Sequence, residues 1–308
     1  MFFDHDSRWQ RAGEVTVERL LARFGQHGLH PERFGLVVLR ERQNARPVGY
    51  AWRGDWQCYP CSLVKVFHLI HVLNVLDAGR IEPHEDLDRA LHDMIVWSSN
   101  MATNYVIDLI TETTGDTLLD SDALTQWMEK RNETNRFFRR LGWEEFATSN
   151  IAQKLMDDTR YGREAQFAGR KGENLNVLTP LVAARAFHEL FDGIIPLSAE
   201  SRVRAMDTLR RNPDAPDAAL PGYQLREYLG GGIPAGVPIW SKAGRNSWTG
   251  DANASYFKHD LVRLAPANAD PMIIALMTQG KSLCDDLPMA FPEMGQIIFE
   301  TFSDATSR

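Results

Sequence analysis

Residues 58 to 78 read Cys58-Tyr-Pro-Cys-Ser62-Leu-Val-Lys65-Val-Phe-His-Leu-Ile-His-Val-Leu-Asn-Val-Leu-Asp-Ala78, and this stretch decides the fold. From residue 63 onward, apolar side chains occupy almost every face of a 3.6-residue repeat, which is typical of a helix buried on all sides. Pro60 suits the first position of a helix, because its missing N–H would have no partner there. Gly79 can adopt the left-handed conformation that ends a helix. The sequence therefore predicts a central, buried helix that opens near Cys61.

Ser62 and Lys65 lie three residues apart in the first turn of this helix, so their side chains are neighbours. A lysine whose charged form is disfavoured by burial can take the proton of an adjacent serine and activate it as a nucleophile. The alternative is structural: Ser62 caps the helix while the lysine side chain extends to solvent. For this motif alone, the structural interpretation is the more frequent one.

The composition is that of an ordinary globular protein: 308 residues, 44% hydrophobic and 24% charged. The net charge of −7 argues against nucleic acid as a partner, which would require a basic surface. No apolar run approaches the roughly 20 residues of a membrane span, and the first residues lack the features of a signal peptide. We expect a cytoplasmic protein, or a periplasmic or secreted one if a leader was removed. The oligomeric state is not predicted.

Three cysteines, Cys58, Cys61 and Cys284, are too few for a disulfide framework. Cys58 and Cys61 form a C-x-x-C pair, which could serve redox chemistry or half of a zinc site. No second pair and no clustered histidines accompany them, so small packing residues are the favoured interpretation. We predict neither a metal nor a cofactor.

The order of elements predicts an α+β fold with a mainly antiparallel sheet, because runs of each type replace regular alternation. Two lobes are expected with the active site between them: a sheet lobe from residues 1–61 and 212–308, and a helical lobe from 62–211. Helices are predicted at 8–25, 62–78, 87–95, 100–111, 122–140, 144–154, 180–191, 201–211 and 288–302, strands at 34–40, 48–57, 238–243, 254–264 and 271–279, and a long loop at 157–173.

Three short motifs occur in an informative order: Ser62-Leu-Val-Lys65, Ser98-Ser99-Asn100 and Lys242-Ala243-Gly244. Each is weak alone, but together they match the S-x-x-K, S-D-N and K-T-G set of class A β-lactamases and penicillin-binding proteins. The chain thus resembles the serine β-lactamase-like family over nearly all its length. The resemblance implies a class A β-lactamase-like fold: a five-stranded antiparallel sheet flanked by helices, with an inserted all-helical lobe.

Two further segments carry the resemblance. The residues from Ser98 to Asn104 resemble the family's Ser-Asp-Asn-x-Ala-x-Asn segment, with Ser99 in place of aspartate. Thr179-Pro180 resembles the helix start that follows the family's omega loop. In the third motif, Ala243 replaces a hydroxyl residue.

The catalytic roles follow from the chemistry of these groups. Ser62, at a helix N-terminus, would be the acyl-accepting nucleophile, and Lys65 would accept its proton. Lys242 would help to keep Lys65 neutral by repulsion of like charges. Ser98 can relay a proton to the leaving nitrogen, and Asn100 can hold a substrate amide.

The resemblance implies further site residues. The backbone N–H groups of Ser62 and Arg245 would form the oxyanion hole, and Ala243, Gly244 and Arg245 would contact substrate. Class A enzymes also carry an omega-loop glutamate that activates the deacylating water. Here the loop offers Glu164 and Glu173, and Glu173 is the candidate base, although it falls later than the family's glutamate and a surface or capping carboxylate is the favoured interpretation.

The sequence therefore predicts a metal-free serine hydrolase that forms an acyl-enzyme on Ser62 and acts on a small-molecule amide, lactam or ester. Slow release of β-lactams is expected. The alternatives are a peptidase or amidase of the penicillin-binding type, or a binding or sensor domain that is acylated but does not turn over.

Overall fold

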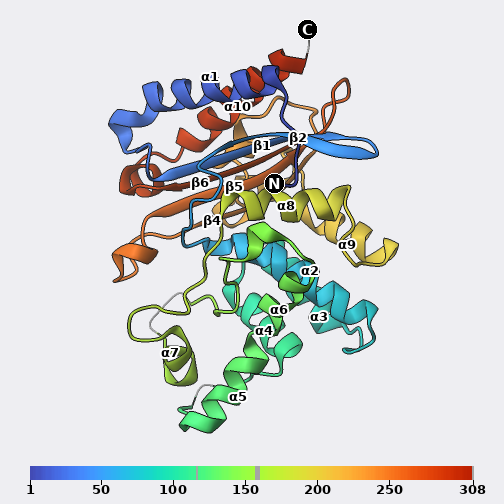
Figure 1. Ribbon diagram of the computed structural model, residues 1–308, viewed down its shortest axis with the longest axis vertical. Helices are drawn as coiled ribbons and strands as arrows, with labels where there is room; N and C mark the ends of the chain where they lie inside the picture. Colours follow the sequence, from blue (N-terminus) through green and yellow to red (C-terminus); the bar gives the residue numbers. More distant parts are fainter. Residues whose placement is uncertain (116, 157–159, 307–308) are drawn as a thin grey trace.

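The computed structural model describes residues 1–115, 117–156 and 160–306 of the chain. In these residues one antiparallel sheet has the strand order β2-β1-β6-β5-β4-β3 (Figure 1). The strands are β1 (Phe34–Arg42), β2 (Ala45–Trp52), β3 (Arg210–Arg211), β4 (Ile239–Arg245), β5 (Phe257–Leu264) and β6 (Met272–Gln279). The family's five strands thus become six, because the short β3 pairs with β4 through Arg211 and Ile239.

Both faces of the sheet are buried, as the alternating side chains of β1 show. Leu36 and Val38 belong to one apolar core, whereas Val37 and Leu39, which point to the opposite face, belong to the other. Helices α1 (Ser7–Phe24) and α10 (Ala290–Thr306) cover the first face, and α2 (Val64–Asp77) and α8 (Pro180–Phe191) lie on the second (Figure 1). A strand buried on both faces reads as a continuous apolar run, as β1 does.

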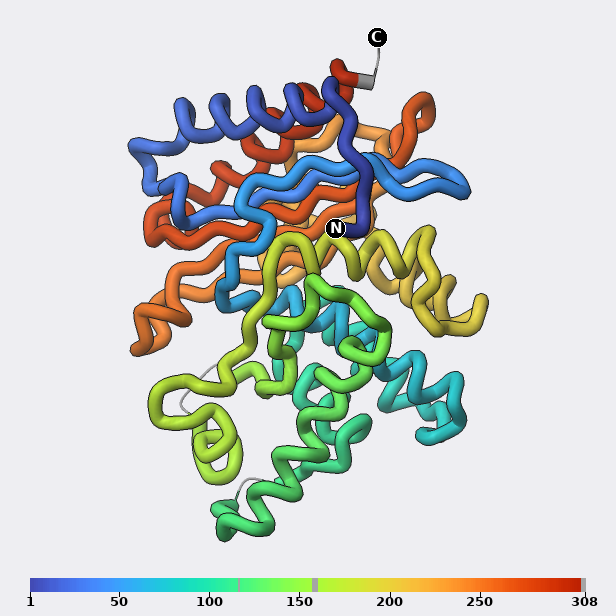
Figure 2. The backbone as a smooth tube through the Cα atoms, in the orientation of Figure 1, coloured from blue at the N-terminus to red at the C-terminus, as the bar shows by residue number. Residues whose placement is uncertain are grey.

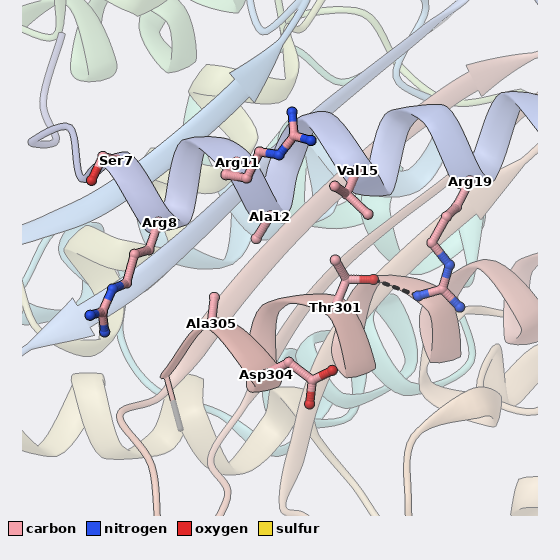
Figure 3. Close-up of a pocket in the computed structure, with 9 residues that line it drawn as sticks. All are labelled: Ser7, Arg8, Arg11, Ala12, Val15, Arg19, Thr301, Asp304 and Ala305. Carbon is pink, nitrogen blue, oxygen red and sulfur yellow. Dashed lines mark hydrogen bonds between the residues drawn. The ribbon is translucent and has the colours of Figure 1, made fainter. Parts of the chain in front are cut away.

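A shallow groove runs between α1 and α10 on the outer face (Figure 3). Its lining combines the apolar residues Ala12, Val15 and Ala305 with Arg8, Arg11 and Arg19. It contains none of the three motifs, so the chemistry must be sought on the other side of the sheet.

The two ends of the chain share the sheet, and the middle of the chain forms the helical part beneath it (Figure 2). Its other helices are α3 (Glu85–Val96), α4 (Asn100–Thr111), α5 (Ser121–Arg131), α6 (Glu133–Arg140), α7 (Gly162–Ala168) and α9 (Ala199–Leu209). The expected lobe boundary at residue 212 would leave β3 with the helices, although its backbone pairs with β4. The division into two lobes stays a prediction. No helix in the described ranges is long and apolar enough to cross a bilayer.

The central helix is confirmed, with a modified start. A 3₁₀ turn, η2 (Cys61–Leu63), precedes α2. Most side chains of α2 are buried, on every face of the helix. Gly79 follows it with φ 64°, the left-handed conformation expected at a helix end. Thr179 caps α8 by accepting a hydrogen bond from the Val182 N–H, with Pro180 in the first helical position.

Three sequence-based elements were wrong. The helix predicted at 122–140 is two helices, because the chain turns at Asn132, which ends α5 and begins α6. The helix predicted at 144–154 is only the 3₁₀ turn Glu144–Phe146, since the backbone of Asn150 pairs instead with Val177. The loop predicted at 157–173 contains α7; its residues 157–159 lie outside the described residues.

Candidate active site

A cleft beside η2 brings the three motifs near one another. Ser62 from η2, Asn100 from the start of α4 and Arg245 from the end of β4 all line it. The loop that connects Gln153 to Asn176 supplies the opposite wall, with Leu155, Met156, Arg160 and Leu175. The connection between β4 and β5 closes a third side with Asn246, Ser247, Trp248, Thr249, Gly250 and Asp251.

Ser62 is held against the edge of β4. Cys61, directly before it, has the left-handed φ of 49°, which costs a non-glycine residue about 1–2 kcal/mol. A Cβ atom added to Gly244 would lie 2.5 Å from the Ser62 nitrogen, so only glycine permits this approach. Strained backbone of this kind persists where the surrounding structure holds it, and it is common at active sites. The third motif thus positions the first.

Lys65 is buried in α2 and reaches the second motif. Its Nζ donates to the carbonyl oxygen of Ser98, lies 3.3 Å from Ser98 Oγ and donates to Asn100 Oδ1 at 2.9 Å. Ser98 has a left-handed φ of 57°, a second strained residue in the site. Its carbonyl and hydroxyl oxygens both lie near Lys65 Nζ.

Lys242 approaches Ser98 from β4. Its fully buried Nζ donates to Ser98 Oγ at 2.9 Å, to Gln224 Oε1 at 2.6 Å and to the carbonyl of Ala243 at 2.7 Å. Burial, reinforced by the positive charges of Lys65 and Arg211, holds the pKa of Lys242 well below its usual value. Ser98 Oγ is thus shared by the two lysines, at 3.3 and 2.9 Å.

Gln224 is a site residue that the sequence analysis missed. It follows a 3₁₀ turn at Pro221–Tyr223 and has a φ of 54°. Its amide oxygen makes the shortest of the three hydrogen bonds that Lys242 donates. No sequence pattern marks a lone glutamine in a proline-rich connector, so only its position in the fold reveals it.

The departures from the family motif have structural explanations. Ser99 caps α4 by accepting a hydrogen bond from the Ala102 N–H at 3.1 Å, a task that serine and aspartate perform equally well. The Ala243 side chain is buried in the core between the sheet and α1 and α10, so it does not line the cleft. Gly244 contributes space rather than a side chain.

Neither loop glutamate lines the cleft. Glu164 is buried in an ion pair with Arg131, with its two oxygens 2.7 and 2.9 Å from the guanidinium. Glu173, the candidate deacylation base, is exposed and accepts a hydrogen bond from the Lys171 N–H at 3.0 Å. Of the cleft-lining residues that the structure describes, Asp251 alone carries a carboxylate.

Asn104 anchors the loop wall. Its amide nitrogen donates to the Leu155 carbonyl at 2.7 Å, and its oxygen accepts from the Leu155 N–H at 3.0 Å. Leu155 is therefore fixed in the cleft wall by both of its backbone polar groups.

The cysteines are free thiols and all are buried. Burial raises the pKa of the Cys58 and Cys61 thiols well above the usual value, which disfavours the reactive thiolate. Within the described ranges, no three histidine, cysteine or acidic residues gather as metal ligands would.

Comparison with known proteins places this site in a family. The sequence model of the beta-lactamase enzyme family matches residues 85–302. The chain belongs to the beta-lactamase enzyme family. The match begins after Ser62 and Lys65, so it covers the second and third motifs of this β-lactamase-like serine hydrolase but not the first. No curated protein sequence gives a significant match.

Solved class A β-lactamases share the fold. The class A β-lactamase of the last common ancestor of Gram-negative bacteria superimposes with a TM-score of 0.62 at 19% identity, covering 94% of this chain and 99% of that one. A β-lactamase from Burkholderia vietnamiensis gives 0.63 at 17% identity, with 98% of each chain covered. The class A enzyme from Mycobacterium abscessus gives 0.60 at 17%, covering 94% and 99%. At these identities the likeness concerns the fold, and it confirms the predicted fold class.

Proposed function

We propose that this β-lactamase family member forms an acyl-enzyme on Ser62 from a lactam or a related small amide and releases β-lactams slowly. The observation that carries the proposal is the position of Ser98 Oγ between Lys65 and Lys242, at 3.3 and 2.9 Å. This arrangement supplies a proton path between Lys65, in the first turn of α2, and Lys242 on β4.

In the acylation step, Ser62 Oγ attacks the carbonyl carbon of the lactam and the carbon–nitrogen bond breaks. Lys65 takes the serine proton, and Ser98 delivers a proton to the leaving nitrogen. Positioned acid–base groups of this kind contribute about 10²–10⁴-fold to a rate. The low pKa of Lys242, caused by burial and by neighbouring cations, supports a site in which an extra proton is disfavoured.

The developing oxyanion would be stabilised by the backbone N–H groups of Ser62 and Arg245. The close approach of Gly244 to the Ser62 nitrogen supports this pairing, because Arg245 is the next residue along β4. Each such donor is worth about 3 kcal/mol. Asn100, at the edge of the cleft, would hold a substrate amide.

Deacylation is the slow step in this proposal. It requires a base that can activate a water beside the ester. Glu164 is neutralised by Arg131, and Glu173 lies on an exposed turn, so neither is placed to act on an ester at Ser62. We expect a burst of acylation followed by a low steady rate.

The test is a time course of intact-protein mass after addition of a β-lactam. The wild type should gain the full mass of the lactam, because opening the ring loses no atoms, and the adduct should accumulate. Ser62→Ala should gain nothing while keeping a cooperative unfolding transition. An adduct that still forms on Ser62→Ala would refute the assignment of Ser62 as the nucleophile.

Glu173→Gln provides the matched loop control. The burst and the steady phase should both stay within about twofold of wild type, since exposed substitutions away from a site have small effects. A hundredfold slower steady phase would instead identify Glu173 as the deacylation base. Clearance of β-lactams without a burst would contradict slow release.

A further inference from the structure

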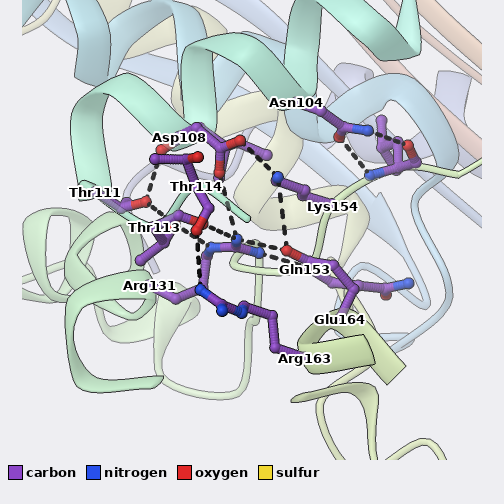
Figure 4. A network of polar contacts seen from close by, with 12 residues as sticks. Asn104, Asp108, Thr111, Thr113, Thr114, Arg131, Gln153, Lys154, Arg163 and Glu164 are labelled. Carbon is purple, nitrogen blue, oxygen red and sulfur yellow. Dashed lines mark hydrogen bonds and ion pairs between the residues drawn. The ribbon is translucent and has the colours of Figure 1, made fainter. Parts of the chain in front are cut away.

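Four charged side chains form a buried network behind the cleft-wall loop, here called the Arg131 cluster: Arg131, Glu164, Asp108 and Lys154 (Figure 4). Arg131 binds Glu164 in bidentate fashion at 2.7 and 2.9 Å and lies 3.6 Å from Asp108. Lys154 Nζ lies 2.6 Å from Asp108 and 3.6 Å from Glu164. Two cations and two carboxylates therefore surround one another.

The cluster is largely shielded from water. The Arg131 side chain is fully buried and that of Glu164 is 5% exposed. The guanidinium lies 4.3 Å from the centre of the Trp127 ring and 5.8 Å from that of Phe167, and its Nε donates to Thr113 Oγ1 at 2.9 Å. Bidentate pairing and stacking make arginine difficult to replace in such a site.

Helix α4 connects this cluster to the cleft. Asn100, Asn104 and Asp108 follow one another at intervals of four residues, so they lie along one face of the helix. The first accepts a hydrogen bond from Lys65, the second holds Leu155, and the third binds Lys154. Since Lys154 and Leu155 are consecutive, the same helix face orders the active site and the loop wall.

The loop is attached to the rest of the protein at its two ends and through α7. At the ends, Gln153 and Asn176 exchange three hydrogen bonds of 2.8 to 2.9 Å. Between the two ends, Glu164 in α7 binds Arg131. Other α7 side chains add neutral or apolar contacts: Gln166 exchanges two part-buried hydrogen bonds with the Leu119 backbone, at 2.9 and 3.0 Å, and the buried Phe167 packs against Trp127. The hydrogen bond from Arg163 to the carbonyl of Thr117 at 2.9 Å is exposed. Among the residues that the structure describes, the Arg131 cluster is thus the buried ion-paired attachment of this loop.

We propose that the Arg131 cluster is a positioning device that holds Leu155, Met156 and Leu175 in the cleft wall. None of its four residues lines the cleft, so it acts through the loop rather than on substrate. This inference rests on the proposed function only for its kinetic consequence. Substrate recognition at the wall should depend on the cluster, while the chemistry at Ser62 should not.

The principal variant is Glu164→Gln, which removes one charge at nearly constant volume. The β-lactam concentration for half-maximal acylation should rise by about tenfold to a hundredfold, the effect of a misplaced wall, with saturated acylation within about threefold of wild type. Trypsin cleavage at Arg163, Arg170 or Lys171 should also accelerate by about tenfold as the loop detaches. Glu164→Asp, which keeps the charge, should recover part of both effects.

Lys130→Met is the matched control. Lys130 precedes Arg131 and pairs with Glu112 at the surface, at 3.1 Å. Its loss should leave both measurements unchanged. If Glu164→Gln behaves like Lys130→Met, the cluster has no positioning role.

A second variant tests the proposal if Glu164→Gln does not fold. Lys154→Met changes the edge of the cluster, where the side chain is 10% exposed, and should show the same two effects at smaller size. If Glu164→Gln does not fold and Lys154→Met matches the control, the proposal is refuted. If the wild type is never acylated at Ser62, the proposed function fails, but the trypsin measurement still tests the cluster.

Discussion

Two buried cations, Lys242 beside the cleft and Arg131 behind the loop, have opposite surroundings. Lys242 donates to three neutral oxygens, and its pKa is held well below the usual value, first by burial and then by Lys65 and Arg211. Arg131 binds a carboxylate in bidentate fashion and stacks on Trp127. Neither side chain has measurable exposure.

The difference separates the proposed reactive site from a structural cluster. An amine without a carboxylate in its hydrogen-bond shell can lose its proton, and the proposed acylation requires proton transfer. A paired guanidinium keeps its charge, so it provides a permanent attachment. Burial alone therefore does not tell the function of a cation; the charge of its hydrogen-bond acceptors does.

The largest expected effect is on the structural side of this comparison. Arg131→Met should lower the free energy of unfolding by about 3–5 kcal/mol, because it leaves the Glu164 carboxylate buried without its principal partner. Urea unfolding measures this change. A loss below about 1 kcal/mol would show that the cluster is as dispensable as a surface pair.

The same substitution at Lys242 should act in the opposite direction. Lys242→Met should raise the free energy of unfolding at neutral pH by about 1–3 kcal/mol, because folding no longer transfers a lysine amine from water to a buried position without a bound carboxylate. A folded-state pKa below the unfolded value means that wild-type stability increases as pH rises toward about 10.4. The gain should therefore shrink with rising pH, and a gain independent of pH would contradict this explanation.

The kinetic counterpart concerns the pH dependence of acylation. If Lys242 disfavours an extra proton on Lys65, Lys242→Met should move the rising limb of the pH–rate profile upward by about one pH unit, equivalent to about 1.4 kcal/mol. Stopped-flow acylation across pH measures the shift. If the rising limb does not move, Lys242 does not disfavour the protonation of Lys65. Lys65 would still be the proposed acceptor of the serine proton.

Gln224 should have the smallest effect of the four. Gln224→Leu removes one neutral acceptor from Lys242, a loss of about 1 kcal/mol for a typical hydrogen bond. Acylation should fall by about tenfold or less, and the free energy of unfolding should fall by about 1 kcal/mol or less. A loss as large as that caused by Lys242→Met would make Gln224 an essential part of the site.

The first part of the candidate site could be predicted because it is local. Ser62 and Lys65 are adjacent through helix spacing alone, and the Thr179-Pro180 helix start follows from the capping preferences of those residues. The segment that leads into the cleft-wall loop was harder to predict. Residues 144–154 have helix-forming side chains, yet Asn150 pairs with Val177 and Asn104 binds Leu155, so distant contacts override local preference.

By itself, the sequence determined the buried central helix, since an apolar surface on all sides has no other stable position. It also determined the order of the three motifs and their elements. Only the tertiary structure decided that Lys242 donates to Ser98, 144 positions away, and that Gln224 accepts from the same lysine. The tertiary structure likewise engaged Glu164 with Arg131 and left Glu173 exposed. Spacing along a chain specifies neighbours within a helical turn, whereas the partners of a buried charge depend on which strands and loops pack against it.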